Sequence, residues 1–115
     1  MKNFVKKKWG SYEVINEGKK YTVKKLIVEP DGQLSLQSHK GRSEHWLVAQ
    51  GEAEVIINDE TYNLTENEHI FIPIGAKHRL TNKSSQNLII VEMWFGEKLD
   101  KNDITRYEDI YGRVL

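Results

Sequence analysis

Residues 37–44 read QSHKGRSE and residues 73–78 read PIGAKH, and together they supply an amide, two imidazoles and a carboxylate. Successive side chains of a strand alternate between its two faces, so residues two apart point the same way. Gln37 and His39 therefore share a face, and only a closed barrel would bring Glu44 and His78 to the same point. These four donors predict a divalent-metal site inside an all-β barrel.

The rest of the chain keeps the two-residue period of β-strands, with turn residues at regular intervals. Many short strands with regular turns are typical of an all-β sandwich or barrel. Trp9 to Glu13 is expected to be a strap that packs against the barrel. Lys101 to Asp109 is predicted to form a short C-terminal helix, capped by Asn102 or Asp103. The expected strands cover residues 21–28, 34–39, 45–49, 52–57, 61–64, 69–72, 78–81 and 87–95.

The composition narrows the class of protein. The chain has 115 residues, of which 30% are charged, and a formal net charge of zero. We expect one domain over residues 1–115 and no nucleic-acid partner, because there is no global basic field. The chain has no cysteine, which excludes thiolate zinc sites and cysteine nucleophiles. Lysines near the start precede no apolar segment, and the run Leu88–Val91 is too short to span a bilayer, so we expect a cytoplasmic protein without membrane contact.

The neighbours of the four donors indicate which way they point. Glu44 shares a strand face with Trp46 and Val48, whose apolar side chains make that face the inward one. His78 opens a strand on which Leu80 points inward. The nitrogen and oxygen donors suit zinc, and also manganese, iron, cobalt or nickel, so ligand type does not choose the ion. The other two histidines are not expected to be ligands: alternation turns His45 to the opposite face, and His69 is an exposed strand start.

The spacing of these residues resembles the two motifs of the cupin superfamily. The first motif runs from Gln37 through His39 and Glu44 to Gly51, and the second from Pro73 through Gly75 and His78 to Asn82. Cupins usually have His-x-His where this chain has Gln37, Ser38 and His39. Glutamine at the first position is similar to the phosphomannose isomerases. This resemblance implies that a zinc-type ion is held by Gln37, His39, Glu44 and His78.

Nearly the whole chain resembles the C-terminal domain of type II mannose-6-phosphate isomerases. The matching pieces are WGSYE (9–13), LSLQ (34–37), RSEHW (42–46), LTEN (64–67), HRL (78–80) and RYEDIYGR (106–113). The resemblance implies a cupin-type double-stranded β-helix, or jelly-roll barrel. It also implies a metal-dependent isomerase that interconverts mannose 6-phosphate and fructose 6-phosphate through an enediol. Lys40 and Gly41 depart from the pattern, because members of this family commonly have histidines there.

Members of this family are usually fused behind a nucleotidyltransferase that makes GDP-mannose, and this chain has no Gly-rich nucleotide loop. The expected partner is therefore a small phosphorylated sugar, with a separate mannose-1-phosphate guanylyltransferase as a further candidate. Two alternatives stay open: an isomerase or epimerase of a nucleotide-linked sugar, and a non-catalytic module that binds sugar or metal. Edge strands of small jelly rolls are commonly hidden by self-association, so we also expect a homodimer.

Lysine and arginine residues are the candidates for acting on the substrate. Alternation turns Lys24 toward the interior, where a desolvated ammonium group would have a lowered pKa and could carry a proton. The alternative is a strand-end lysine whose head reaches solvent. Arginine suits phosphate because its planar fork matches two oxygens at once. Arg42, Arg79, Arg106 and Arg113 are therefore predicted to bind the substrate, with Arg42 and Arg113 counted beside Lys24 as catalytic residues.

Overall fold

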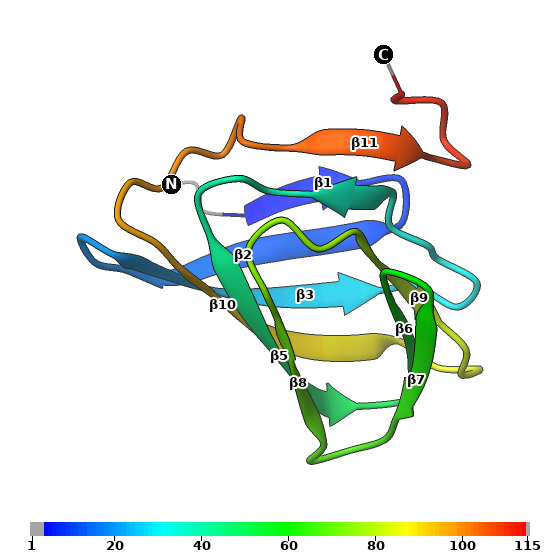
Figure 1. The fold of residues 1–115 in the computed structure, drawn as a ribbon. Coiled ribbons are helices and arrows are strands. Elements are labelled where there is room, and N and C mark those ends of the chain that lie inside the picture. Colours follow the sequence, from blue (N-terminus) through cyan, green and yellow to red (C-terminus); the bar gives the residue numbers. More distant parts are fainter. Residues whose placement is uncertain (1–3, 115) are drawn as a thin grey trace.

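The computed structural model describes residues 4–114, which form two antiparallel β-sheets packed face to face (Figure 1). The six-stranded sheet has the order β1-β2-β3-β10-β5-β8 and the five-stranded sheet the order β11-β4-β9-β6-β7. The first sheet consists of β1 (Phe4–Lys7), β2 (Gly10–Glu17), β3 (Tyr21–Val28), β10 (Leu88–Phe95), β5 (Ser43–Gln50) and β8 (His69–Ile72). The second consists of β11 (Thr105–Glu108), β4 (Leu36–Ser38), β9 (His78–Asn82), β6 (Ala53–Ile57) and β7 (Glu60–Leu64).

Alternating side chains build the core between the sheets. Along β3 every second residue is buried, and the same alternation runs through β5 and β10. Burying a leucine, isoleucine or valine side chain of this kind stabilises the fold by roughly 1.5–3 kcal/mol. The apolar core includes Leu26, Val28, Val48, Val55, Ile72, Leu80, Leu88 and Ile90. The same alternation also places charged residues inside, and these line a cavity between the sheets.

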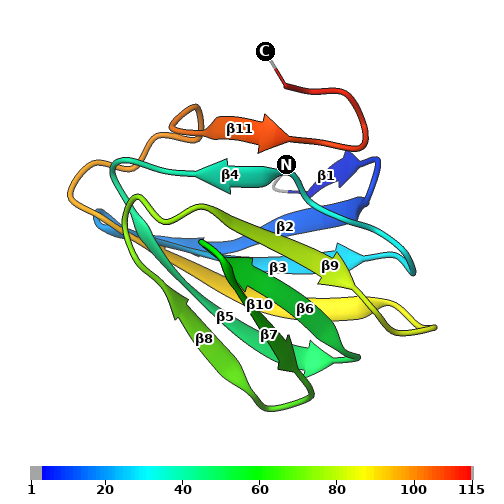
Figure 2. The ribbon, with the colours of Figure 1, turned by 45° about the vertical axis from the view of Figure 1, so that its right-hand side comes forward.

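The two sheets bring their edge strands β1 and β11 to the same end of the molecule (Figures 1 and 2). Between β10 and β11 the chain runs through a loop, residues 96–104, that reaches the turn between β4 and β5. There the carboxylate of Asp103 accepts hydrogen bonds from the backbone N–H groups of Lys40 (2.9 Å) and Gly41 (2.7 Å). The loop is thereby fixed beside His39, whose ring contacts the Asp103 carbonyl.

The predicted all-β fold is confirmed, but the short helix predicted over Lys101 to Asp109 is wrong. Within residues 4–114 the structure forms strands, turns and loops and no helix. Thr105–Glu108 instead pairs with β4 as β11. The two residues expected to cap that helix make other contacts. Asp103 accepts a hydrogen bond from the β4–β5 turn, and Asn102 donates its backbone N–H to Asp100 at 2.9 Å. Sheet pairing at an open edge outweighs the weak local helix preference of this segment.

Two further strands were not expected from the sequence. Residues 4–7 form β1, and residues 10–13 of the segment interpreted as a strap belong to β2. Trp9, in the turn between them, is buried in the core, as its expected packing role requires. Across the described part of the chain we find no helix with the length and apolarity needed to cross a membrane.

Candidate metal centre and its cavity

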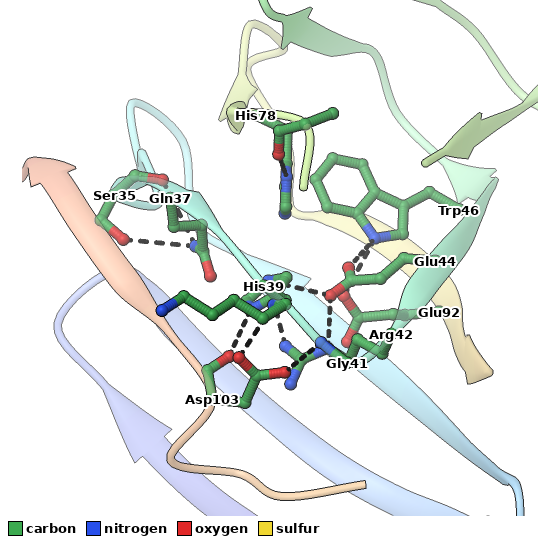
Figure 3. A network of polar contacts seen from close by, with 12 residues as sticks. Ser35, Gln37, His39, Gly41, Arg42, Glu44, Trp46, His78, Glu92 and Asp103 are labelled. Atoms are coloured by element: carbon green, nitrogen blue, oxygen red, sulfur yellow. Dashed lines mark hydrogen bonds and ion pairs between the residues drawn. The ribbon is translucent and has the colours of Figure 1, made fainter. Parts of the chain in front are cut away.

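A buried group of two histidines and one glutamate lies at one end of the space between the sheets. One ligand atom from each of His39, Glu44 and His78 lies within 4.8 Å of the others, and all three side chains are at most 2% exposed. His39 follows β4, Glu44 lies on β5 and His78 opens β9, so the group joins both sheets (Figure 3). This geometry can hold a metal ion.

Both histidines are oriented by backbone carbonyls. The Nδ1–H of His39 donates to the carbonyl of Asp103 at 2.7 Å, and the Nδ1–H of His78 donates to the carbonyl of Ala76 at 2.9 Å. Each ring therefore keeps the lone pair of its Nε2 for the centre of the group, as metal-bound histidines do. Burial lowers the pKa of His78, which favours the neutral imidazole that a metal requires.

Arg42 and Trp46 hold the carboxylate of Glu44. Arg42 Nε donates to Glu44 Oε2 at 2.8 Å, and Trp46 Nε1 donates to Glu44 Oε1 at 2.9 Å. Burial opposes ionisation of Glu44, but its contact with the His39 ring, 3.1 Å from Nε2 to Oε2, and the charge of Arg42 outweigh it and hold its pKa well below the usual range. The carboxylate is therefore ionised and available as a ligand at neutral pH.

Gln37 lies next to this group. It is the cross-strand partner of His78, so the two side chains are neighbours on adjacent strands. Its amide nitrogen donates to the Ser35 carbonyl (3.3 Å) and hydroxyl (3.2 Å). Because the amide NH₂ is turned to Ser35, the amide oxygen is left for the cavity, and Figure 3 shows the side chain of Gln37 directed toward the space beside His39.

A second carboxyl group, that of Glu92 on β10, lies beside Glu44. It was not predicted from the sequence to be a site residue. Trp46 Nε1 also donates to Glu92 Oε2, at 2.9 Å. Burial raises the pKa of Glu92 to about 8, and the negative charge of Glu44 contributes to the same shift. Glu92 therefore keeps its proton at neutral pH. Alternation from Leu88 and Ile90 was the available signal, since it places Glu92 on their inward face.

Lys24 points into the cavity rather than into solvent. Its Nζ lies 4.2 Å from the centre of the Tyr12 ring and 3.7 Å from that of Trp94. It is also the cross-strand partner of Glu92. Burial lowers the pKa of Lys24, and the nearby positive charge of Arg42 lowers it further. An ammonium group held between two aromatic rings in this way is desolvated but still stabilised by their π faces.

The predicted arginines fall into two sets. Arg42, Arg106 and Arg113 line a cavity of about 370 Å³, together with Gln37, Glu44, His78 and Lys24. Arg79 does not line it, because its guanidinium donates to the Leu34 carbonyl and to Glu108 of β11, each at 3.1 Å. The structure thus gives Arg79 contacts that fasten β9 to β11.

The donor set fits a divalent ion. Two imidazole nitrogens and a carboxylate, with an amide oxygen next to them, are ligands that zinc and its first-row neighbours accept. One contact has to change on binding, because Arg42 Nη2 lies 3.1 Å from His39 Nε2 and would share the lone pair that a metal needs. Arg42 also stacks on Trp94, with its Cζ 3.5 Å from the ring centre.

Solved structures with the same fold include the Cnp3 cupin domain of Schizosaccharomyces pombe. The two share 11% sequence identity with a TM-score of 0.73, over 75% of this chain and 64% of that one. CapF of Staphylococcus aureus, a capsular polysaccharide assembling protein, aligns with a TM-score of 0.79 and 22% identity, over 92% of this chain and 32% of that one. These likenesses show that the fold is that of a cupin. More narrowly, the chain belongs to the family described as Mannose-6-phosphate isomerase C-terminal, which it matches over residues 1–109.

Curated relatives are much longer proteins. Mannose-1-phosphate guanylyltransferase ManC of Salmonella typhimurium is 46% identical over 106 residues, and the alginate biosynthesis protein AlgA of Pseudomonas aeruginosa is 45% identical over 106 residues. Each alignment covers 92% of this chain and 22% of the relative. The chain therefore spans less than a quarter of the length of these relatives.

These relatives overturn the function expected from the sequence. The sequence predicted an isomerase that interconverts mannose 6-phosphate and fructose 6-phosphate. Proteins that are 43–46% identical to this chain over 106 aligned residues are instead named as guanylyltransferases or polysaccharide biosynthesis proteins, and the chain corresponds to only a small part of each. The prediction of that isomerase is therefore wrong, and family membership is what the comparisons establish.

Proposed function

We propose that the cavity holds a divalent metal ion and takes a phosphorylated sugar, as an enzyme site in mannose-phosphate metabolism. The observation that carries this proposal is the buried group His39, Glu44 and His78, which opens into a cavity lined by cations. Gln37 would be the fourth protein ligand, through its amide oxygen. Zinc is the ion we expect, and manganese, cobalt, nickel and iron suit the same donors.

The residues around the metal group define the chemistry the cavity can support. A bound divalent ion would polarise carbonyl and hydroxyl oxygens of a sugar as a Lewis acid. Lys24 is the proton carrier we propose, since its ammonium group is buried in the cavity and its pKa is lowered by burial. Arg42 fixes the carboxylate of Glu44, and its buried Nη1 has no hydrogen-bond partner among the described residues. Arg42 is therefore available to the substrate as well, with Arg106 and Arg113.

The names of the relatives support the pathway part of the proposal. A guanylyltransferase that uses mannose 1-phosphate belongs to GDP-mannose biosynthesis, and ManC carries that name. We infer that this chain acts in the same pathway as one cytoplasmic domain over residues 1–115, with a separate guanylyltransferase as a candidate partner. The homodimer belongs to the proposal too, because the outer face of the six-stranded sheet carries exposed apolar side chains: Leu47, Phe71, Met93 and Phe95.

A two-stage binding experiment tests the proposal. Protein stripped with a chelator is first titrated with Zn²⁺ and analysed for bound metal, and the loaded protein is then titrated with mannose 6-phosphate. We expect one ion per chain and sugar-phosphate binding that chelator reverses. A wild-type protein that takes up no divalent ion would overturn the metal centre. Stoichiometric metal without any binding of mannose 6-phosphate would overturn the ligand class and leave the metal centre standing.

A further inference from the structure

Two acceptor atoms of the candidate metal group face each other at close range. Nε2 of His39 lies 3.1 Å from Oε2 of Glu44. Because the Nδ1–H of His39 donates to the Asp103 carbonyl, Nε2 of the neutral ring carries a lone pair and no hydrogen. A lone pair and a carboxylate oxygen at this distance repel each other unless a positively charged group bonds them both. This pair of atoms is therefore stabilised by a cation in the folded protein.

The guanidinium of Arg42 supplies that cation and bonds both atoms at once. Its Nε donates to Oε2 of Glu44 at 2.8 Å, and its Nη2 donates to Nε2 of His39 at 3.1 Å (Figure 3). The other carboxylate oxygen, Oε1, accepts a hydrogen bond from the Trp46 indole instead. Arg42 therefore covers the imidazole nitrogen and the carboxylate oxygen that lie closest together, and a metal ion bound by both residues would use the same two atoms.

Few other contacts hold the guanidinium of Arg42 in this position. Its Nη1 is buried without a hydrogen-bond partner among residues 4–114, and its Cζ lies 3.5 Å from the centre of the Trp94 ring. Stacking on an aromatic face sets the plane of a guanidinium but leaves it free to turn within that plane. Arg42 can therefore release His39 and Glu44 while it keeps its contact with Trp94.

We propose that Arg42 is a displaceable internal cation, which bonds two of the metal donors and gives them up when a divalent ion binds. This inference rests on the proposed metal centre and adds a control on how tightly that centre holds its ion. Without an ion, Arg42 keeps the buried carboxylate paired and both donor atoms in position. Metal uptake is then an exchange of one cation for another, so the affinity is lower than the donors alone would give.

The zinc affinity of Arg42→Met, measured by competition with a chromogenic chelator, tests this exchange. Methionine fills similar space but donates to neither atom. We expect the variant to bind zinc roughly tenfold more tightly than the wild type, or tighter still, because the wild type gives up two charged hydrogen bonds that the variant never makes. Lys20→Met is the matched control. It removes a cation from an exposed ion pair with Glu97 and should bind zinc as the wild type does.

Thermal unfolding of the same variant separates competition from ligand positioning. Arg42→Met stripped of metal should unfold at a lower temperature than the wild type, because the buried carboxylate of Glu44 loses its partner. Zinc should then raise the unfolding temperature of the variant by more than it raises that of the wild type. Equal or weaker zinc binding by the folded variant would show that Arg42 orients Glu44 for the ion, and would overturn the exchange while leaving the metal centre standing. A wild type that binds no zinc would overturn both.

A measurement on the wild type covers the case in which Arg42→Met does not fold. The Nε–H signal of Arg42 is followed by NMR of arginine-labelled protein during a zinc titration. We expect this signal to shift and its hydrogen to exchange faster with solvent, because its bond to Glu44 is lost. Arg79, whose Nε donates to the Leu34 carbonyl outside the cavity, is the internal control and should keep its signal. An unchanged Arg42 signal at full zinc loading would overturn the exchange.

Discussion

Single side chains decide whether the cavity can hold a metal, and His78 is the clearest case. Its Nδ1 is occupied by the Ala76 carbonyl, so its only free ring nitrogen faces Glu44 and His39. We predict that His78→Ala binds less than a tenth of the wild-type zinc at equal free ion, because losing one of few ligands removes a large share of the affinity. Metal content after dialysis against buffered Zn²⁺ measures this.

His45 provides the control for that prediction. It lies on the outer face of β5 with its ring 4.9 Å from that of Phe71, so His45→Ala should keep full metal content. Circular dichroism of both variants checks that the sheets are intact. If His78→Ala retains stoichiometric zinc while folded, His78 is not a ligand.

Glu92 gives a prediction about pH. Its pKa rises from the ordinary 4.5 to about 8 through burial and the charge of Glu44, so between these values the folded protein binds a proton that the unfolded chain has lost. The stability that this proton contributes is complete below pH 4.5 and declines as pH rises toward 8, by up to about 1.4 kcal/mol per pH unit. Glu92→Gln should remove this decline in chelator-treated protein.

The measurement is urea unfolding at several pH values between 5 and 8. Glu29→Gln, at an exposed position, should keep the wild-type pH dependence. Parallel curves for Glu92→Gln and the wild type over this range would show that Glu92 is already ionised in the folded protein.

At the scale of an element, the loop of residues 96–104 holds His39 and the β4–β5 turn in position. Its residue Asp103 binds two backbone N–H groups of the β4–β5 turn through its carboxylate and the ring of His39 through its carbonyl. Burial opposes ionisation of Asp103, but the hydrogen bonds from Lys40 and Gly41 outweigh it and lower the pKa. We predict that Asp103→Ala weakens zinc affinity roughly tenfold, as the loss of groups that orient ligands commonly does.

Competition of the loaded protein with a chromogenic chelator measures that affinity. Glu97→Ala removes the same charge from the same loop, where Glu97 makes only an exposed ion pair with Lys20, and should leave the affinity unchanged. Equal affinities for Asp103→Ala and the wild type would show that the turn holds its shape without this carboxylate.

The sequence predicted the elements with a clear two-residue period and missed those without one. Tyr21–Val28 and His69–Ile72 were predicted with their observed bounds, because hydrophobic alternation is visible in them. Residues 4–7 were missed, since a run of lysines hides which side chain faces inward, and residues 105–108 were missed because their strand forms only by pairing with β4. Gly41 is a further example of a contact that the sequence does not show. In the structure, a Cβ atom added at Gly41 would lie 3.2 Å from Asp103 Oδ2.

For the candidate site, alternation correctly placed His39, Glu44, His78 and Lys24 inside. The spacing of residues in the sequence could not show that the guanidinium of Arg79 pairs with Glu108, because that contact depends on how β11 packs against the sheet. The roles assigned to these residues stay predictions until metal and ligand binding are measured.

At the scale of the whole molecule, the outer face of the six-stranded sheet, with its exposed apolar side chains, is the surface that we propose for self-association. We predict a homodimer in solution, and we expect Met93→Glu to shift it to the monomer, because Met93 is 40% exposed beside His45 on this face. Light scattering coupled to size-exclusion chromatography gives the mass directly. Ile110→Glu changes an exposed apolar residue in the segment after β11, away from this face, and should leave the dimer intact. A monomeric wild type at high micromolar concentration would contradict the prediction.

The contact between His39 and Asp103 also bears on how late the site is completed during synthesis. The residues that could hold a metal lie between residues 37 and 78, but the carbonyl that orients His39 belongs to Asp103. A nascent chain therefore lacks the finished arrangement of this group until nearly all of it has been synthesised.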